Sequence, residues 1–383
     1  MAASSSPSLL AAPSSTSSSS SSSCPLPNSE SISSSNARVI RWGICGTGAI
    51  ASDFVTVLTR LHNTEVAAVG SRTLESARRF ADRFGIPSSY GSYDELAADD
   101  SLDVVYVATP TFRHVEDSLM VLKAGRAVLC EKAMAQNSEE TLRVVEFARS
   151  RRLFFLHGVW SRFFPAMAKI REIIDSGEIG VVRSVHASFC QNDGAGTCSA
   201  TLETGIYVAQ FLQWAFGGVA PLKVDGVSFE LNPNGNDEHV AALLHFPGGG
   251  VGTFECSLRH PSTRSAEICG SEGVIRVPFP FWCPTQVSSQ RMTGLGSQTW
   301  EPEQVFSVDL PLPESETGLK DDGSDFNFVN SKGLAYEAEE VNRCLRQGLL
   351  ESPLFSAAEC CSVMSVISDI RDRWMKSPAV AEW

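Results

Sequence analysis

The sequence lacks three features that would assign the protein to a narrow class. No apolar run reaches the length of about 18 residues that a membrane-spanning helix needs. No concentrated basic stretch interrupts the formal net charge of -13, so the chain would repel nucleic acid and anionic lipid. No Cys-x-x-Cys pair offers a zinc site, and we predict no metal ligands. These absences argue against a membrane-embedded protein, a nucleic-acid-binding protein and a zinc domain.

The 11 cysteines are odd in number and scattered, which argues against a disulfide framework. Cys45, Cys130 and Cys190 lie inside apolar, strand-like runs. We therefore predict buried free thiols in a protein of a reducing compartment.

The first 36 residues contain no Lys or Arg and a single acid, Glu30, and serine dominates them. Such a tract cannot bury enough apolar surface to order itself, so residues 1–37 are excluded from the predicted fold. Two interpretations stay open. The tract is either a disordered tail of a cytoplasmic protein or a plastid transit peptide, since Ser-rich, acid-poor segments are typical of plastid targeting.

A dinucleotide-binding unit is predicted directly after this tract. Residues 39–45 have the composition of a buried strand, and residues 49–61 have the apolar spacing of a helix. Between and after them, Gly46, Gly48 and Ala51 stand in G-x-G-x-x-A register. The first glycine permits a tight turn, the second lets the backbone approach a pyrophosphate, and the third small residue packs helix against strand. The phosphates would lie at the helix N-terminus, whose free N–H groups favour an anion.

The second predicted strand, residues 65–70, is followed by Ser71 and Arg72. An NAD-selective site places an acid here to hold the ribose 2′-hydroxyl, whereas an Arg accommodates the 2′-phosphate of NADP. Because no acid stands at this strand end, we predict NADP as the cofactor. The alternative is that Arg72 is a solvated residue at the start of the helix 74–84, for which Thr73 is the N-cap.

Strands and helices continue to alternate as far as residue 156. Further strands are predicted at 103–108, 127–130 and 153–156, and helices at 113–123 and 139–149, the latter begun by Ser138. Such alternation indicates right-handed crossovers, so residues 38–158 are predicted to form an α/β Rossmann domain with a doubly wound parallel sheet.

Two ends of these strands carry residues suited to a cofactor. Thr109 and Pro110 follow one strand, with His114 nearby, and Glu131 and Lys132 end another. Ligands bind outside the carboxyl ends of parallel strands, on the same edge as the glycine turn. We therefore predict that both strand ends face the nicotinamide.

Residues 159–383 are predicted to form a second domain of the α+β type with an open, mostly antiparallel sheet. After a helix at 165–176, strand patterns recur at 181–190, 222–231, 239–246, 250–258, 265–268 and 274–277. Gly-rich turns join neighbours, which indicates hairpins instead of crossovers. Two helices, at 334–347 and 356–374, close the domain. A large sheet with one uncovered face commonly pairs, so we predict a homodimer.

Several segments are familiar in combination: GICGTGAIA at 43–51, ATPTFRH at 108–114, AVLCEK at 127–132, WSRFFP at 160–165 and SKGLAYEAEEV at 331–341. Together they resemble the Gfo/Idh/MocA oxidoreductase family, and within it the dimeric dihydrodiol dehydrogenase branch. The resemblance covers about residues 38–376 and implies an NADP-dependent dehydrogenase.

The resemblance also implies roles for individual residues. Lys132 would lie beside the nicotinamide and hydrogen-bond the substrate hydroxyl, and Tyr207 would handle the proton, with the neighbouring ammonium lowering its pKa. Trp160 would wall the substrate pocket, with Arg162 a second substrate contact. Residues expected at the cofactor are Gly46, Thr47, Gly48, Ala49, Ile50, Ser71, Arg72, Thr109, Pro110, His114, Glu131 and Lys132.

The chain departs from the family pattern at three places. Ala133 stands where the family has a proline after the lysine, so the turn loses a fixed φ. Glu203 replaces the usual Asp before Tyr207, and the stretch that leads to this motif is shorter than in relatives. Judged without the resemblance, Lys132 is also compatible with a solvated strand end, Tyr207 with a helix-face aromatic and Trp160 with core packing.

Three hypotheses for function remain open. The first is an NADP-dependent dehydrogenase that oxidises a trans-dihydrodiol or an aldose such as xylose, as the retained lysine and tyrosine favour. The second is a nucleotide-binding sensor that has lost turnover, as the shortened stretch and Ala133 favour. The third is a family dehydrogenase for a different polyol or sugar derivative.

Overall fold

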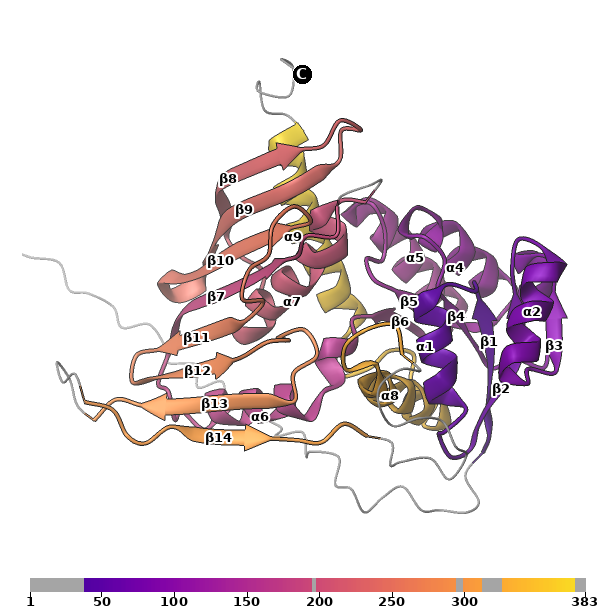
Figure 1. Cartoon of the computed structure of the whole chain (residues 1–383), viewed down its shortest axis with the longest axis horizontal. Helices are drawn as coiled ribbons and strands as arrows, with labels where there is room; N and C mark the ends of the chain where they lie inside the picture. The colour runs from indigo at the N-terminus through magenta and orange to yellow at the C-terminus, as the bar shows by residue number, and fades with distance from the viewer. Residues whose placement is uncertain (1–37, 195–197, 294–298, 312–325, 376–383) are drawn as a thin grey trace, which may run out of the picture. The chain divides into compact units, whose positions relative to one another are not determined.

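The computed structural model describes residues 38–194, 198–293, 299–311 and 326–375, so the predictions for residues 1–37 lie outside the described part of the chain. The described residues build two sheets, each with helices packed against it (Figure 1). Within these residues, no helix is both long enough and apolar enough to cross a membrane.

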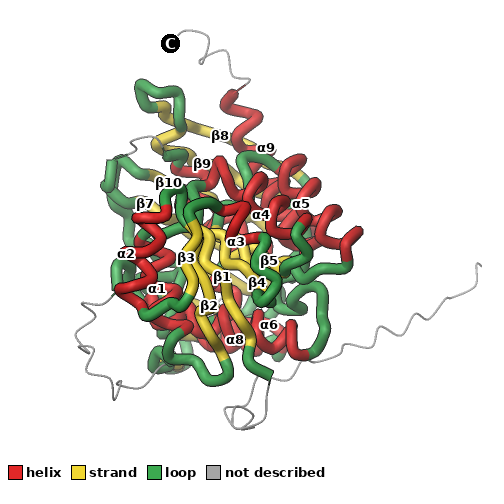
Figure 2. The backbone as a smooth tube through the Cα atoms, turned by 90° about the vertical axis from the view of Figure 1, so that its right-hand side faces the viewer, coloured by secondary structure: helices red, strands yellow, loops and turns green. Residues whose placement is uncertain are grey.

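The first sheet is parallel and has six strands in the order β3-β2-β1-β4-β5-β6. Its strands are β1 (Ile40–Cys45), β2 (Thr64–Gly70), β3 (Ser88–Tyr90), β4 (Val104–Val107), β5 (Ala127–Glu131) and β6 (Phe155–Gly158). The connecting helices are α1 (Ala49–Leu58), α2 (Leu74–Phe84), α3 (Tyr93–Ala97), α4 (His114–Lys123) and α5 (Ser138–Arg151). Figure 2 shows α1 and α2 on one side of the strands and α4 and α5 on the other. This is the predicted doubly wound sheet, and its strand order reverses between β1 and β4, the position at which such sheets bind ligands.

Local signals explain most of the element boundaries. Thr73 is the N-cap of α2, as predicted, and accepts a hydrogen bond from the Ser76 N–H. The prediction for α5 was wrong by one residue, because Asn137 is the N-cap and accepts from the Glu140 N–H at 2.9 Å. The sequence analysis missed β3 and α3, since elements of three and five residues are too short to show a period.

The second sheet has eight strands in the order β14-β13-β12-β11-β7-β10-β9-β8. They are β7 (Val182–Cys190), β8 (Lys223–Leu231), β9 (Asp237–Phe246), β10 (Gly250–Ser257), β11 (Ala266–Gly270), β12 (Gly273–Val277), β13 (Gln286–Arg291) and β14 (Gln304–Ser307). The expectation of hairpins alone was wrong for one pair, because β7 and β10 run parallel. A helix and the β8-β9 hairpin lie between them in the chain, which turns this connection into a crossover. The sequence analysis also missed β13 and β14.

Helices cover one face of this sheet. They are α6 (Pro165–Asp175), α7 (Ile206–Ala215) and α9 (Ala357–Met375) (Figure 1). The other face is hollowed, with a volume of about 860 Å³, and Leu243 and Val305 on it are exposed. Helix α8 (Leu334–Arg346) packs against α1 of the first sheet instead. All cysteines in the described ranges are free thiols, which confirms that prediction for Cys45, Cys130 and Cys190.

One buried carboxylate fixes the returning C-terminal segment to α1. Asp53 is fully buried and accepts hydrogen bonds from the Asn327 N–H at 2.9 Å, the Asn327 amide at 2.6 Å and the Phe328 N–H at 3.2 Å. The Ser331 hydroxyl donates a further bond at 2.6 Å. Because the Asp53 side chain is buried, its carboxylate needs these donors, since a buried carboxylate without partners costs free energy.

We predict that Asp53→Ala lowers the free energy of unfolding by about 2–4 kcal/mol, because the buried carboxylate that accepts from Asn327, Phe328 and Ser331 is lost. Urea unfolding followed by fluorescence measures this. Asp82→Ala, at an exposed position of α2, is the matched control and should change stability by less than about 0.5 kcal/mol. Equal losses in the two variants would contradict the anchoring role of Asp53.

Candidate active site

The glycine turn after β1 leaves open space at the start of α1. Gly46 has φ +115°, and a Cβ on it would lie 2.8 Å from the Ala108 carbonyl oxygen, so only glycine fits. Gly48 is the N-cap of α1 and has no side chain to cap the helix, and a Cβ added there would meet nothing within 4 Å. The first N–H groups of α1, beginning with Ala49 and Ile50, therefore remain available to an anion.

Hydroxyl groups gather beside this turn at the end of β2. The Thr47 hydroxyl lies 3.5 Å from that of Ser71 and 3.3 Å from that of Ser76. Arg72 follows Ser71 and is exposed, and within the described ranges its guanidinium makes no hydrogen bond or ion pair. These groups fit the ribose end of a dinucleotide, with Arg72 free to meet a 2′-phosphate. Ser76 was missed, because it lies inside a helix that the sequence explains without a ligand.

His114 joins the ends of β4 and β5. Its Nδ1 lies 2.7 Å from the Ala133 carbonyl oxygen and its Nε2 lies 2.7 Å from the Thr109 carbonyl oxygen. Burial lowers the pKa of His114, against the opposing effect of the two carbonyls. The Thr109 hydroxyl donates to Asp117 at 2.8 Å, so this turn is tied to α4 as well. His114 and Thr109 hold the two strand ends in place, and Pro110 leads from Thr109 into the following helical turn.

Glu131 and Lys132 point to different partners. The Glu131 carboxylate is buried and accepts hydrogen bonds from the Tyr106 hydroxyl and, at 3.0 Å, from the Lys132 N–H. Burial raises the pKa of Glu131. The Lys132–Ala133 peptide bond is cis. The hydrogen bonds of Glu131 thus anchor the end of β5 within the first sheet. The Lys132 side chain instead reaches toward the second sheet.

The Lys132 ammonium bonds to the segment that precedes α7. It donates to the Glu203 carboxylate at 2.8 Å and to the Glu203 carbonyl oxygen at 3.2 Å, and it lies 5.8 Å from the centre of the Tyr207 ring. Burial alone would lower the pKa of Lys132, but the charge of Glu203 outweighs burial and raises it above its usual range. The Lys132 charge in turn lowers the pKa of Glu203. The two groups are therefore an ion pair at neutral pH.

Glu203 and Tyr207 are positioned by a π-helical turn, Thr201–Gly205, that leads into α7. Asp237 at the start of β9 accepts hydrogen bonds from the Thr201 N–H at 2.7 Å and hydroxyl at 2.6 Å, which fixes the beginning of this turn. A Cβ on Gly205 would lie 2.7 Å from the Phe254 ring, so glycine lets the turn approach β10.

Tyr207 is buried beside Lys132, and its hydroxyl accepts a hydrogen bond from the Trp160 indole N–H at 3.0 Å. The neighbouring ammonium was expected to lower the pKa of Tyr207. It does act in that direction, but burial outweighs it and raises the pKa of Tyr207 above its usual range. Tyr207 is therefore a neutral phenol at neutral pH.

Aromatic rings surround Tyr207. Trp160, in the 3-10 turn Trp160–Phe163, packs edge-on against Phe164 at 5.4 Å between ring centres. Phe189 lies 5.7 Å from the Tyr207 ring and stacks on Trp282 at 4.0 Å. The sequence analysis missed Phe189, because a phenylalanine in an alternating strand is equally a core residue.

Arg162 is not brought together with this group. Its guanidinium is buried and donates to the Glu359 carboxylate at 2.6 Å and to the Leu354 carbonyl oxygen at 3.1 Å. It also stacks over the Phe355 ring at 4.8 Å. A substrate contact by Arg162 stays a prediction, and it would require this ion pair to open.

Glu337 of α8 is a buried acid that the sequence analysis missed, because no motif or spacing marks it. It is fully buried, and neither carboxyl oxygen has a hydrogen-bond partner among the residues that the structure describes. Burial, together with the charge of Glu131, raises the pKa of Glu337 well above its usual range. Glu337 is therefore uncharged beneath the site, since an isolated buried carboxylate is very costly.

A doubly wound sheet with an open glycine turn after its first strand is typical of NAD(P)-binding oxidoreductases, and Lys132 after β5 lies beside Tyr207 of α7. Residues 40–158 match the model of the oxidoreductase family with an NAD-binding Rossmann fold, and residues 167–276 match the Gfo/Idh/MocA C-terminal domain. The chain belongs to the Gfo/Idh/MocA oxidoreductase family. It is an NAD(P)-dependent dehydrogenase of the dihydrodiol dehydrogenase branch.

The assignment to this branch rests on curated relatives. The chain is 36% identical over 342 residues to the trans-1,2-dihydrobenzene-1,2-diol dehydrogenases of Sus scrofa and of Homo sapiens, covering 87% of this chain and 96% of each relative. The enzyme of the same name from Danio rerio is 35% identical over 345 residues, again with 87% and 96% covered.

Solved structures share the fold at lower identity. KijD10, a 3-ketoreductase from Actinomadura kijaniata solved with NADP and TDP-benzene, is 24% identical with a TM-score of 0.72, covering 87% of this chain and 96% of that chain. Levoglucosan dehydrogenase, solved with NADH and levoglucosan, is 17% identical with a TM-score of 0.73, covering 88% and 97%. At these identities the likeness shows the fold alone.

The ion pair at the centre of the site makes stability depend on pH. Because Glu203 has a lowered pKa in the folded protein, its contribution is complete above the ordinary Glu pKa of about 4.3 and is lost as the pH falls through the folded value. We predict that Glu203→Gln lowers the free energy of unfolding by about 1–2 kcal/mol at neutral pH, and that the difference shrinks in acid.

Urea unfolding at neutral pH and at a series of pH values below about 4.3 tests this prediction. Glu75→Gln is the control, because the Glu75–Arg79 pair is exposed on α2 and should contribute little. A stability difference for Glu203→Gln that stays constant with pH would show that the Glu203 charge does not stabilise the fold.

Proposed function

We propose that this enzyme oxidises a trans-dihydrodiol, or an aldose at its anomeric carbon, with NADP as the hydride acceptor. The observation that carries the proposal is the approach of Lys132, at the carboxyl end of β5, to the buried Tyr207 of α7, with Trp160 hydrogen-bonded to the tyrosine. Relatives that are 36% identical over most of their length are named for this diol chemistry. A flat ring also suits the aromatic wall of Trp160 and Phe189.

In this proposal, Lys132 and Tyr207 both contact the reacting oxygen of the substrate. Hydride loss from a carbon that bears a hydroxyl requires the O–H proton to leave, and the Lys132 ammonium stabilises the negative charge that develops. Tyr207 exchanges the proton with the substrate oxygen. The bond from the Trp160 indole leaves Tyr207 its own O–H to donate, because the indole donates and the phenol oxygen accepts.

The protonation states of Lys132 and Tyr207 at neutral pH favour the reduction of a carbonyl over the oxidation of a hydroxyl. With raised pKa values, Lys132 and Tyr207 both begin protonated, as needed to reduce a carbonyl. For oxidation, the phenol proton must first leave, so the oxidation rate should rise with pH.

The residues around the glycine turn fit a dinucleotide. The α1 N-terminus would hold the pyrophosphate, with Gly46, Gly48, Ala49 and Ile50 forming the turn and first helical residues. Thr47 and Ser71 would meet the adenosine ribose and Arg72 its 2′-phosphate. Thr109, Pro110, His114 and Glu131 would frame the nicotinamide end through the backbone that they fix.

Two properties of the protein in the cell belong to the same proposal. The uncovered face of the eight-stranded sheet, with Leu243 and Val305 exposed, supports a homodimer, which light scattering of the protein in solution would test. The compartment is the cytoplasm or, if residues 1–37 are a transit peptide, the plastid.

We predict that Arg72→Ala weakens binding of NADP much more than that of NAD, by roughly 1.5–3 kcal/mol, because a charge-assisted phosphate contact is lost. Fluorescence titration with both cofactors measures this. Arg78→Ala, an exposed arginine on the same helix α2, is the control and should change neither affinity. Equal losses for NADP and NAD would contradict the assignment of Arg72.

Lys132→Met and Tyr207→Phe keep much of the side-chain volume and remove the charge and the acid. Each should lower kcat by about 10²–10⁴-fold and leave NADP affinity nearly unchanged. The double variant should fall far short of the product of both losses, because the two groups act together. Lys123→Met, at the exposed end of α4, is the control.

Turnover of a panel of diols and sugars with NADP, followed by nicotinamide absorbance, tests the substrate class. Oxidation of trans-dihydrodiols or of xylose supports the proposal. If the enzyme oxidised only other polyols, the proposed substrate class would be wrong and a different polyol would be its substrate. NADP binding without any turnover would contradict the proposal and favour a sensor. Near-normal turnover by Lys132→Met would show that the pair is not catalytic.

A further inference from the structure

A second group of chemically active side chains lies at one end of the eight-stranded sheet, away from Lys132 and Tyr207. The register of strands β7, β9 and β10 brings these side chains together. Ser257 of β10 is the register partner of Cys190 on β7 and of His239 on β9. Glu255, two residues before Ser257, has its side chain on the same face, because side chains alternate along a strand.

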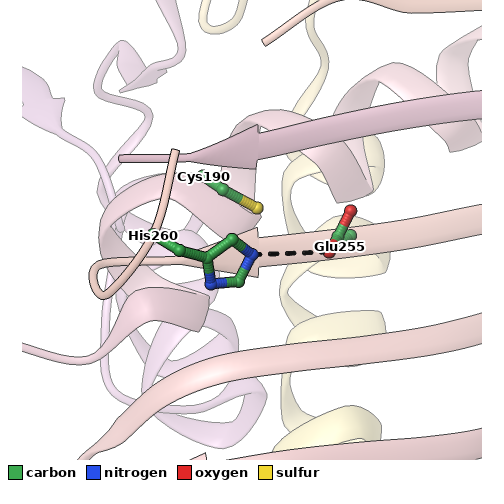
Figure 3. Close-up of side chains that lie close together, drawn as sticks. All are labelled: Cys190, Glu255 and His260. Carbon is green, nitrogen blue, oxygen red and sulfur yellow. Dashed lines mark ion pairs between the residues drawn. The ribbon is translucent and has the colours of Figure 1, made fainter. Parts of the chain in front are cut away.

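The chain then turns back over this face after β10. His260 follows Ser257 by three residues, and its Nδ1 lies 3.1 Å from the Ser257 hydroxyl. Its Nε2 lies 3.8 Å from a Glu255 carboxylate oxygen. Figure 3 shows Cys190, Glu255 and His260 converging from two strands and the turn.

The donor atoms of these three residues lie within 4.8 Å of one another. Tetrahedral zinc binds sulfur at about 2.3 Å and nitrogen or oxygen at about 2.0–2.2 Å, which separates its ligands by roughly 3–4 Å. A small inward rotation of Glu255 or His260, both partly exposed, would bring the three donors to these distances.

We propose that Cys190, Glu255 and His260 bind one divalent metal ion of the zinc type. A thiolate, an imidazole and a carboxylate are the ligand types that zinc selects, whereas magnesium and calcium prefer oxygen alone. Local spacing could not reveal this site, because its ligands come from separate segments and only the sheet register joins them.

Two neighbours complete the surroundings of the ion. Ser257 is fully buried, and its hydroxyl can accept a hydrogen bond from the His260 Nδ1–H, which leaves the Nε2 lone pair available to the metal. His239 lies beside Glu255, outside the group of three donors, and its ring would have to move to supply a fourth ligand. Its Nε2 is buried, has no hydrogen-bond partner within the described ranges and lies 3.5 Å from a Glu255 carboxylate oxygen.

The ion would fix the end of β7 and the turn after β10 to each other. The Gln191 N–H donates to the Ser257 carbonyl oxygen at 2.9 Å, and the Gly194 N–H donates to the Leu258 carbonyl oxygen at 3.1 Å. The chain continues from there to the turn that carries Glu203. The metal is therefore structural, and it acts outside the proposed hydride-transfer chemistry.

The test uses the full-length protein without a histidine tag, stripped of metal and titrated with Zn²⁺ or Co²⁺ alone. One equivalent should bind, and Co²⁺ should show a thiolate charge-transfer band in the near ultraviolet. Cys190→Ser should abolish the band, and His260→Asn and Glu255→Gln should each weaken binding at least tenfold. Zn²⁺ should raise the melting temperature of the parent protein and leave that of Cys190→Ser unchanged.

The matched controls are Cys269→Ser on β11 and His245→Asn on β9, which remove a thiol and an imidazole from the same sheet. Both should bind one equivalent with the parent affinity. Because His260 is partly exposed, His260→Asn keeps the test valid even if Cys190→Ser fails to fold. Absence of the charge-transfer band in the parent, or unchanged binding in His260→Asn, would overturn the proposal. Neither outcome affects the test of Lys132 and Tyr207.

Discussion

The ion pair between Lys132 and Glu203 is the contact on which the active site depends. Lys132 ends a strand of the parallel sheet, and Glu203 belongs to the turn that follows the first strand of the second sheet. Burial lowers the pKa of Lys132, and the charge of the Glu203 carboxylate outweighs this effect, so the lysine stays charged. The same contact holds the ammonium beside the Tyr207 ring. The Lys132–Glu203 pair therefore keeps the lysine charged, holds it beside Tyr207 and links the two sheets.

Two buried acids, Glu131 and Glu337, also belong to the surroundings of this site, and burial raises the pKa of both. Tyr106 donates to Glu131, which accepts a second bond from the Lys132 backbone, so the strand end is held by hydrogen bonds instead of by opposite charges. Glu337 is uncharged because burial raises its pKa. The protein therefore keeps a single strong partner for the lysine, on the side where substrate would bind.

Local sequence patterns predicted the parallel sheet well. They could not predict contacts between residues that are distant in the sequence. The glycine turn, the Thr73 cap and the strand leading to Glu131 follow from short-range rules of turn, cap and period. The role of Glu131 as an anchor needed Tyr106, which lies on the neighbouring strand. The pairing of Arg162 with Glu359 joins residues 197 apart, and the raised pKa of Tyr207 results from burial that only packing determines. The parallel pairing of β7 with β10 likewise has no local sign in the sequence.

The pH dependence of hydride transfer tests the central claim, that Tyr207 moves the proton while Lys132 holds the charge. Single-turnover rates would be measured from nicotinamide absorbance in both directions, for the parent and for Tyr207→Phe. We expect the parent's oxidation rate to rise steadily through the alkaline range and its reduction rate to stay level there, because the raised pKa keeps the phenol protonated at neutral pH. Tyr207→Phe should be slow and independent of pH in the same range. An oxidation rate that is flat with pH in the parent, or a Tyr207→Phe variant that keeps the parent's slope, would contradict the account.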